Sequence, residues 1–163
     1  MVIKEKVQKA INKHINAELY SSYLYLAMAA HFASQNWNGI AHWLKVQSKE
    51  EYGHAMKLYE YVLERGGTVA LTDIGAPKSE WKSVLDAFKE VYGHELKITG
   101  LINDLVKIAR DESDTATEIA LQWFVNEQVE EEANASLLVE QLKRIGDSAN
   151  GLFMFDHELG ERK

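Results

Sequence analysis

One stretch of the sequence, residues 66–79 (GGTVALTDIGAPKS), constrains the fold most, because it is the only long segment without helical periodicity. It begins with two glycines, which commonly end a helix. Fourteen extended residues at about 3.3 Å each reach roughly 46 Å, and a helix of about 30 residues is roughly 45 Å long. The segment is therefore long enough to cross a whole helical bundle. This predicts a four-helix bundle with one long crossover rather than one joined only by short turns.

The rest of the chain has the periodicity of helices. Apolar residues recur at intervals of three and four along four long segments, which is the spacing of one helix face. The single proline, Pro77, lies in the crossover segment. The expected fold is all-α, a four-helix bundle with one long crossover and a short fifth helix at the C-terminus. As one domain over residues 1–163, it comprises helices over about 4–34, 38–65, 80–110 and 115–145, and a tail helix over 148–160.

Capping residues predict where these helices begin. Asn36 or Asn38 is expected to cap the second helix, and Ser79 the third. Thr115 and Glu118 have the spacing of a capping box at the start of the fourth helix. The tail segment is amphipathic but too short to fold alone. We expect it to pack on another surface, such as that of a neighbouring subunit.

Composition and charge exclude several classes of function. The chain has no cysteine, which rules out disulfides, thiolate metal sites and cysteine nucleophiles. Its formal net charge of −7 argues against nucleic acid as a partner and favours cations. No apolar run approaches the roughly 20 residues of a membrane span, and the polar N-terminus lacks a signal-peptide pattern. We expect a cytoplasmic protein without a membrane partner.

Glu51 and His54 form the most distinctive pair of polar residues. They are three residues apart, so they lie on the same face of the second helix, between apolar residues such as Leu44 and Leu58. A carboxylate and an imidazole facing a core are costly to bury unless a charge or a metal ion satisfies them. Glu-x-x-His is also what one helix contributes to a di-iron carboxylate bundle. The motif arises by chance in many helices, so its meaning depends on partners at the same depth.

The other three long helices supply such partners. Glu18, Glu95 and Glu131 each interrupt an apolar stripe near the middle of a helix, and Gln128 shares a face with Glu131. In each antiparallel pair, the polar residues lie about 17 residues, or roughly 25 Å, from the turn that joins the two helices. In a bundle about 45 Å long this is mid-height. Four stripes therefore lose their apolar character at one level.

Two interpretations of this polar layer are open. It could be a buried hydrogen-bond network that fixes the register of the bundle, as core polar groups sometimes do. However, four carboxylates and one imidazole at one depth repel each other strongly without a cation, which favours a metal site. Oxygen-rich ligation with one imidazole suits Fe(II) or Mn(II), whereas zinc prefers a tetrahedral set of His and Cys ligands.

Three motifs, together with the long crossover, make the chain resemble the bacterial non-haem ferritins. They are ELYSSYLYLAM in the first helix, KEEYGHAMKL in the second and WFVNEQVEEE in the fourth. The resemblance covers essentially the whole chain. It implies the ferritin-like fold and a di-iron ferroxidase centre.

The resemblance also implies roles for individual residues. In the di-iron centre, Glu51 bridges a first site with Glu18 and His54 to a second site with Glu95 and Glu131. Gln128 is expected beside the second site. A third iron site, typical of prokaryotic ferritins, is expected at four glutamates: Glu50, Glu127, Glu130 and Glu131. Two aromatic residues match those that supply electrons near the centre, although core packing explains them at least as well: Tyr25 and Trp123.

By the same resemblance, the chain is expected to oxidise Fe(II) to Fe(III) with O2 or H2O2 and to deposit ferric oxyhydroxide mineral inside a hollow shell. The expected shell is a homo-24-mer with octahedral symmetry, in which the tail helix 148–160 would surround the four-fold axes. Asp114 and Glu118 lie near the start of the three-fold channels in that arrangement. Ordinary helix capping is the simpler explanation of these two residues.

Two departures separate the chain from related families. Bacterioferritin and rubrerythrin carry a second Glu-x-x-His in the fourth helix, where this chain has Gln128 and Glu131. The residue after the bridging Glu51 is Tyr52, where bacterioferritins carry the methionine that ligates haem. Iron without haem is therefore the expected metal.

Two other functions remain open. A non-catalytic metal buffer would hold divalent ions without consuming oxygen. A di-iron oxidase acting on an organic substrate would need a substrate channel, which the sequence does not indicate. The remaining histidines show no ligand spacing and are expected to be ordinary surface or core residues: His14, His31, His42, His94 and His157.

Overall fold

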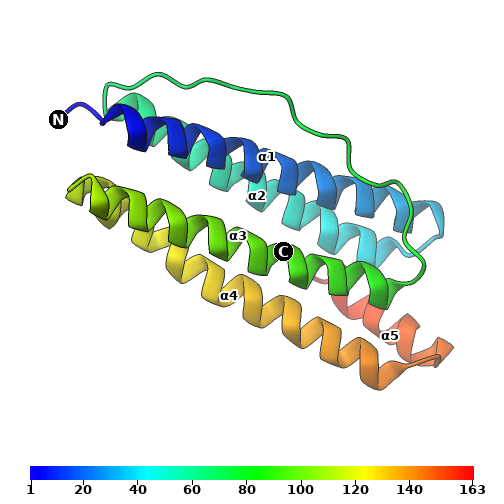
Figure 1. Ribbon diagram of the computed structural model, residues 1–163. Coiled ribbons are helices and arrows are strands. Elements are labelled where there is room, and N and C mark those ends of the chain that lie inside the picture. The colour runs from blue at the N-terminus through cyan, green and yellow to red at the C-terminus, as the bar shows by residue number, and fades with distance from the viewer.

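The computed structural model describes residues 1–163, which form helices and connecting segments without strands. The helices are α1 (Glu5–Ser34), α2 (Asn38–Glu64), α3 (Val84–Asp111), α4 (Thr115–Ile145) and α5 (Ala149–Gly160). The α1–α2 and α3–α4 pairs are antiparallel, and the extended segment after α2 runs along the bundle to begin α3 at the opposite end (Figure 1). The predicted all-α bundle with one long crossover and a short fifth helix is confirmed. None of the helices combines the length and hydropathy that a membrane span requires.

The hydrophobic core is divided in two along the bundle. A cluster of 19 buried residues, which includes Leu44 and Phe88, draws on all five helices. A second cluster of 13 buried residues, which includes Ile15 and Leu58, draws on the other halves of the four long helices. In each long helix, the residues between the two clusters include buried polar side chains: Glu18, Glu51, Glu95 and Gln128. The two apolar clusters therefore fix the depth of a polar layer between them.

The third helix begins at Val84, four residues later than the sequence predicts. Its N-cap is Ser83 rather than Ser79, and Ser83 Oγ accepts a hydrogen bond of 3.0 Å from the amide of Asp86. Trp81 explains the shift, because its side chain is buried in the larger core cluster. The preceding segment is thereby anchored outside the helix.

The cap of α4 also differs from the prediction. Asp114 is the N-cap, and its Oδ1 accepts a hydrogen bond of 3.1 Å from the amide of Thr117. The predicted capping box of Thr115 and Glu118 is therefore wrong. An ion pair of 3.2 Å with Arg65 holds the Asp114 carboxylate at this end of the helix.

Neither Asn36 nor Asn38 caps α2, contrary to the prediction. The N-cap residue is Trp37, which makes no capping hydrogen bond through its side chain, and Asn36 adopts a positive φ of 66° in the turn. A residue of another helix caps α2 instead. Asp156 Oδ1 on α5 accepts a hydrogen bond of 2.8 Å from the backbone amide of Ile40, in the first turn of α2.

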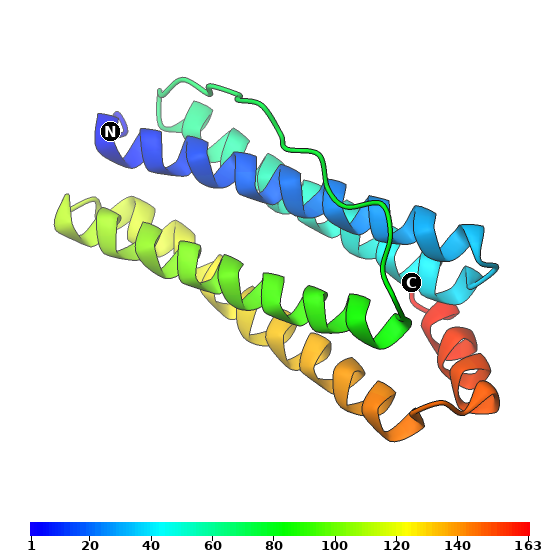
Figure 2. The ribbon, with the colours of Figure 1, turned by 45° about the vertical axis from the view of Figure 1, so that its right-hand side comes forward.

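The tail helix α5 packs closely on the start of α2. Figure 2 shows it lying across the end of the bundle, with the C-terminus beside α2. A Cβ atom at Gly39 would lie only 1.7 Å from the carbonyl oxygen of Asp156. Glycine at this position therefore permits the close approach of the two helices.

Candidate metal centre

A layer of buried polar side chains separates the two core clusters, and all four long helices contribute to it. Each of these side chains belongs to a residue that is at most 7% exposed. Because the helices pack through apolar stripes on both sides, these groups are held at one depth. The structure thus brings together the six residues predicted for the di-iron centre: Glu18 of α1, Glu51 and His54 of α2, Glu95 of α3, and Gln128 and Glu131 of α4.

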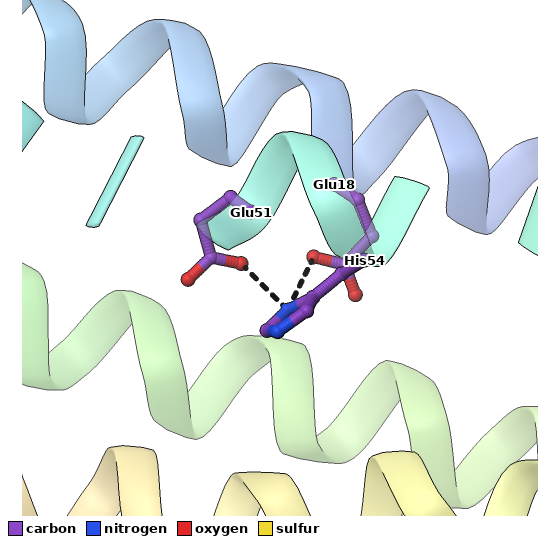
Figure 3. A group of neighbouring side chains, drawn as sticks. All are labelled: Glu18, Glu51 and His54. Atoms are coloured by element: carbon purple, nitrogen blue, oxygen red, sulfur yellow. Dashed lines mark ion pairs between the residues drawn. The ribbon is translucent and has the colours of Figure 1, made fainter. Parts of the chain in front are cut away.

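The first group of possible ligands consists of Glu18, Glu51 and His54, whose ligand atoms all lie within 4.8 Å of one another. His54 Nδ1 is 3.3 Å from Glu51 Oε2 and 3.9 Å from Glu18 Oε2 (Figure 3). Both of these carboxylate oxygens are buried and have no hydrogen-bond partner. Buried acceptors without a donor are costly, and a cation among these three side chains would remove that cost.

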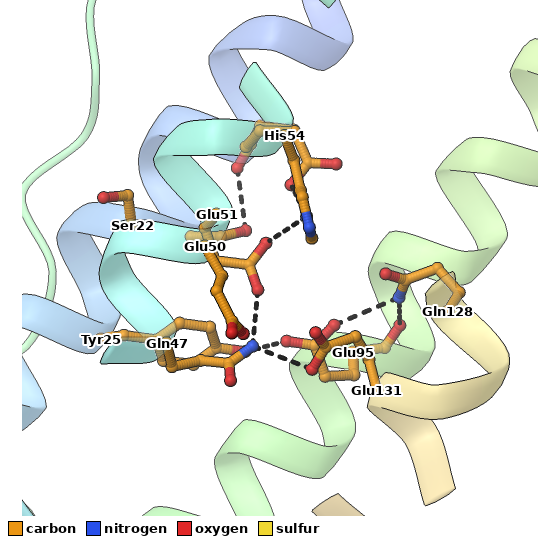
Figure 4. A network of polar contacts seen from close by, with 12 residues as sticks. Ser22, Tyr25, Gln47, Glu50, Glu51, His54, Glu95, Gln128 and Glu131 are labelled. Atoms are coloured by element: carbon orange, nitrogen blue, oxygen red, sulfur yellow. Dashed lines mark hydrogen bonds and ion pairs between the residues drawn. The ribbon is translucent and has the colours of Figure 1, made fainter. Parts of the chain in front are cut away.

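The second group consists of Glu51, Glu95 and Glu131, again with ligand atoms within 4.8 Å of one another. Figure 4 shows these carboxylates meeting across the layer from α2, α3 and α4. Glu51 belongs to both groups. Its carboxylate therefore lies where one residue could contact two cations at once.

Two side chains donate to Glu95. The hydroxyl of Tyr25 donates to Glu95 Oε1, and Gln128 Nε2 donates to Glu95 Oε2 at 3.1 Å. Tyr25 is completely buried. It therefore both packs in the hydrophobic core and contacts Glu95. These two donors orient the carboxylate that α3 contributes.

Sequence reasoning missed two further residues of the layer. Gln47 Nε2 donates to Glu51 Oε1 at 2.8 Å and to Glu131 Oε2 at 2.9 Å. His14 Nε2 donates to Glu18 Oε1 at 2.8 Å, so His14 is a core residue with a specific partner in the layer. Both lie four residues before the glutamate that they contact, and this spacing on a helix face was the available signal. None of the histidines other than His54 joins a group of possible ligands.

Burial raises the pKa of three carboxyl groups in the layer. The pKa of Glu51 and that of Glu131 rise to about 7, and the pKa of Glu95 rises to about 8. Loss of water around the charge is the largest cause in each case, and repulsion between the carboxylates adds to it. Around neutral pH these groups therefore hold protons that a bound cation would displace.

His54 and Glu18 shift in the direction that favours their charged forms. Burial opposes the charge on His54, but its contact with Glu51 and the charges of Glu51 and Glu18 outweigh burial and raise the pKa of His54 to about 9. Burial also opposes the charge on Glu18, yet the hydrogen bond and charge of His14 lower the pKa of Glu18. A cation that binds His54 must therefore replace its proton.

The residues predicted for a third iron site are only partly brought together. Glu127 and Glu131 form a group of possible ligands with His54. Glu130 is exposed and belongs to no such group. Glu50 also lies outside these groups and forms an ion pair of 2.7 Å with Arg162.

Trp123 lies against the imidazole of the first group. Its ring centroid is 5.4 Å from that of His54, in an edge-to-face arrangement. The Nζ atom of Lys57 lies 3.8 Å from the Trp123 centroid on the ring face. Trp123 thus closes one side of the His54 site while 38% of its surface remains exposed.

A cavity of about 510 Å³ lies between α1 and α3, and His14 and His94 are among the residues that line it. None of the six residues of the predicted di-iron centre lines this cavity. The hydrogen-bond partner of Glu18, His14, separates the cavity from the first group. The cavity therefore adjoins the polar layer without opening onto its carboxylates.

Comparison with known proteins agrees with the resemblance found in the sequence. The family profile described as "Ferritin-like domain" matches residues 8–145. A bacterial non-heme ferritin of Bacteroides fragilis (strain 638R) is 44% identical over 161 residues, which cover 99% of this chain and 100% of that protein. One of Staphylococcus aureus (strain MRSA252) is 36% identical, with 99% and 97% covered.

Solved structures give the same result. A novel open pore ferritin from the hyperthermophilic archaeon Archaeoglobus fulgidus superimposes with a TM-score of 0.98. It is 49% identical in sequence, and the match covers 99% of this chain and 98% of that one. The sequence relatives and the solved structure match nearly the full length and the family profile matches the four long helices, so the chain belongs to the ferritin family.

Proposed function

We propose that this protein is an iron-storage ferritin with ferroxidase activity. It oxidises Fe(II) to Fe(III) in the polar layer, uses O2 or H2O2 as the oxidant, and deposits ferric oxyhydroxide mineral inside a shell of 24 copies. Membership of the ferritin family, with full-length relatives named bacterial non-heme ferritins, supports the storage function. The arrangement of carboxylates in the layer supports the oxidation.

The observation that carries the ferroxidase proposal is the position of Glu51. It belongs to both groups of possible ligands, and its Oε2, like that of Glu18, is buried without a hydrogen-bond partner. A carboxylate shared by two sites can hold two cations side by side, as in other two-metal centres. Oxygen ligands with a single imidazole suit Fe(II) as a substrate.

Each residue then has a specific task. Glu18 and His54 complete the coordination of one Fe(II) ion, and Glu95 and Glu131 that of the other. Tyr25 and Gln128 keep Glu95 oriented through their hydrogen bonds. Two substrate ions held on Glu51 lose one electron each, and together they supply the two electrons that reduce O2 to H2O2 or H2O2 to water. Protons displaced from the buried carboxyl groups and His54 are available for that reduction.

A third iron ion is proposed at the edge of the layer. Glu127 and Glu131 provide two of its ligands. Glu50 and Glu130 provide the other two that the family resemblance implies. The ligand atoms of Glu127, Glu131 and His54 lie within 4.8 Å of one another, which supports a site next to the first group. The third ion therefore lies beside the pair rather than within the bundle core.

Oxygen uptake by the purified metal-free protein tests the proposal. We expect fast uptake that saturates at two or three Fe(II) ions per subunit. Iron that binds without oxygen consumption above the protein-free rate would identify a metal buffer and contradict the ferroxidase proposal. An oxidase for organic substrates is not favoured, because the cavity beside the layer is lined by none of the six residues of the proposed centre.

A further inference from the structure

Arg162 lies beyond the end of α5, and its side chain packs against α2. Its Nη2 is 2.7 Å from Glu50 Oε2, and its Nη1 donates to the carbonyl of Trp43 at 3.3 Å. The guanidinium carbon lies 4.5 Å from the centroid of the Trp43 ring. The backbone carbonyl of Arg162 accepts a hydrogen bond of 2.6 Å from His42 Nε2. Four contacts therefore hold this residue in place.

The tail helix delivers Arg162 to this position. Asp156 on α5 accepts the hydrogen bond from the amide of Ile40, and Gly39 allows the two helices to come close together. The C-terminus consequently lies beside α2 (Figure 2). The side chains of Arg162 and Glu50 are 22% and 43% exposed, so their ion pair lies at the margin of the protein and not in its core.

Glu50 is next to Glu51 on α2 (Figure 4). Because Glu50 is exposed whereas Glu51 is buried, Glu50 lies at the edge of the polar layer. Glu127 and Glu131 join a group of possible ligands there with His54, but Glu50 does not. Its carboxylate contacts the guanidinium of Arg162 instead. While this ion pair holds, the Glu50 carboxylate lies outside the group of possible ligands, so it must leave Arg162 to join that group.

We propose that Arg162 is a positioning residue that competes with the third metal ion for Glu50, so that the C-terminal segment sets how tightly this ion binds. The inference rests on the proposed function, because the third site is part of it. The two ions on Glu51 are not affected, because Arg162 contacts no residue of that pair. Occupancy of the third site then requires Glu50 to exchange Arg162 for the metal ion.

Calorimetric titration of the assembled, metal-free protein with Co(II) under anaerobic conditions tests the proposal. We expect Arg162→Ala to lower the dissociation constant of the third Co(II) roughly two- to fivefold, since partly exposed ion pairs contribute about this much. The first two ions should bind as in the parent protein. Arg162→Lys keeps the charge and should give an intermediate value. Lys163→Ala removes a neighbouring exposed charge and should change nothing.

A second background separates competition for Glu50 from a general effect of charge. In Glu50→Gln, the third ion loses a ligand, and adding Arg162→Ala should have no further effect. Tighter binding from Arg162→Ala in that background would overturn the proposal, and so would an unchanged or weaker third ion in Arg162→Ala alone. If every variant binds two Co(II) ions and none binds a third, the proposal about Arg162 is wrong, but the pair of sites that share Glu51 is still supported. If the parent protein fails to bind the first two Co(II) ions, the proposed function is contradicted.

Discussion

Gln47 on α2 donates a hydrogen bond of 2.9 Å to Glu131 on α4, and so connects helices from the two antiparallel pairs across the polar layer. The same Nε2 atom donates to Glu51 at 2.8 Å. One neutral side chain therefore sets the spacing of two of the proposed iron ligands. Such supporting hydrogen bonds orient ligands and tune their affinity for a metal.

We expect Gln47→Leu to slow the initial oxidation of Fe(II) about 10- to 100-fold, which is typical when a residue supporting metal ligands is removed. Leucine is similar in size but cannot donate, so Glu51 and Glu131 lose their shared donor. Initial oxygen uptake measures the effect. Gln122→Leu makes the same change at an exposed position of α4 and serves as the control. A parent-like rate in Gln47→Leu would show that the bridge does not support the centre.

Glu51→Ala is expected to abolish fast oxidation, because Glu51 is the only carboxylate shared by the two proposed iron sites in the pair. Stopped-flow absorbance of the ferric product, recorded after Fe(II) is mixed with oxygenated protein, measures this loss. Glu60→Ala on the exposed side of the same helix should react like the parent protein. Equal initial rates for Glu51→Ala and the parent would refute the bridging role.

The metal-free protein is expected to lose stability as the pH rises from about 5 to about 9. The pKa of Glu95 is about 8 in the folded protein, against an ordinary value of 4.5, so the folded state binds more protons in this interval. The contribution of Glu95 to the free energy of unfolding is complete below pH 4.5 and is lost as the pH rises through about 8. The pKa shifts of Glu51, Glu131 and His54 have the same sign. The lowered pKa of Glu18 makes the stability depend on pH only below about 4.5, the ordinary pKa of a glutamate, and so does not affect this interval.

Thermal unfolding of the metal-free protein at a series of pH values measures this dependence. A net loss of about 2 kcal/mol corresponds to a fall in Tm of roughly 4–8 °C for a chain of this size. Glu95→Gln removes the largest of these carboxyl shifts, so its Tm should depend less on pH. Co(II) should raise the Tm more at pH 8 than at pH 6, because fewer protons must be displaced. A Tm that is constant or increases between pH 5 and pH 8 would contradict the expectation.

The bundle could be predicted because its determinants repeat along the sequence. Apolar stripes define each long helix, and the segment between Gly66 and Ser79 is long enough for a crossover of the full bundle. Glu18 and Glu51 interrupt their stripes at equal distances from the first turn, so their common depth followed from helix geometry. The start of α3 could not be predicted in this way, because Trp81 fixes it through burial in the core.

The residues that donate hydrogen bonds to the carboxylates could not be predicted in the same way. A carboxylate on an apolar face demands a partner, whereas Gln47 and His14 are compatible with many environments. Long-range contacts leave even less signal in the sequence. Arg162 and Glu50 are separated by 112 positions, and nothing in the local pattern of either residue indicates the other. Asp156 likewise caps α2 from a different helix.

The contact between Gly39 and Asp156 leads to a further prediction, for the docking of α5. A Cβ atom at position 39 would lie 1.7 Å from a backbone oxygen, and a backbone group cannot move aside as a flexible side chain can. Gly39→Ala is therefore expected to push α5 away from α2 and to destabilise the protein by about 1–3 kcal/mol, the usual range for overpacking.

Thermal unfolding and limited proteolysis of the C-terminal segment measure these two effects of Gly39→Ala. Gly100→Ala is the matched control, because a Cβ atom there meets nothing within 4 Å and alanine favours the helix by about 0.4–1 kcal/mol. Faster cleavage within α5 in Gly39→Ala alone would show that this glycine holds the tail helix in place. A variant at position 39 as stable and as resistant as the parent would mean that α5 can shift without loss. In that case Arg162 would not depend on this contact for its position beside Glu50.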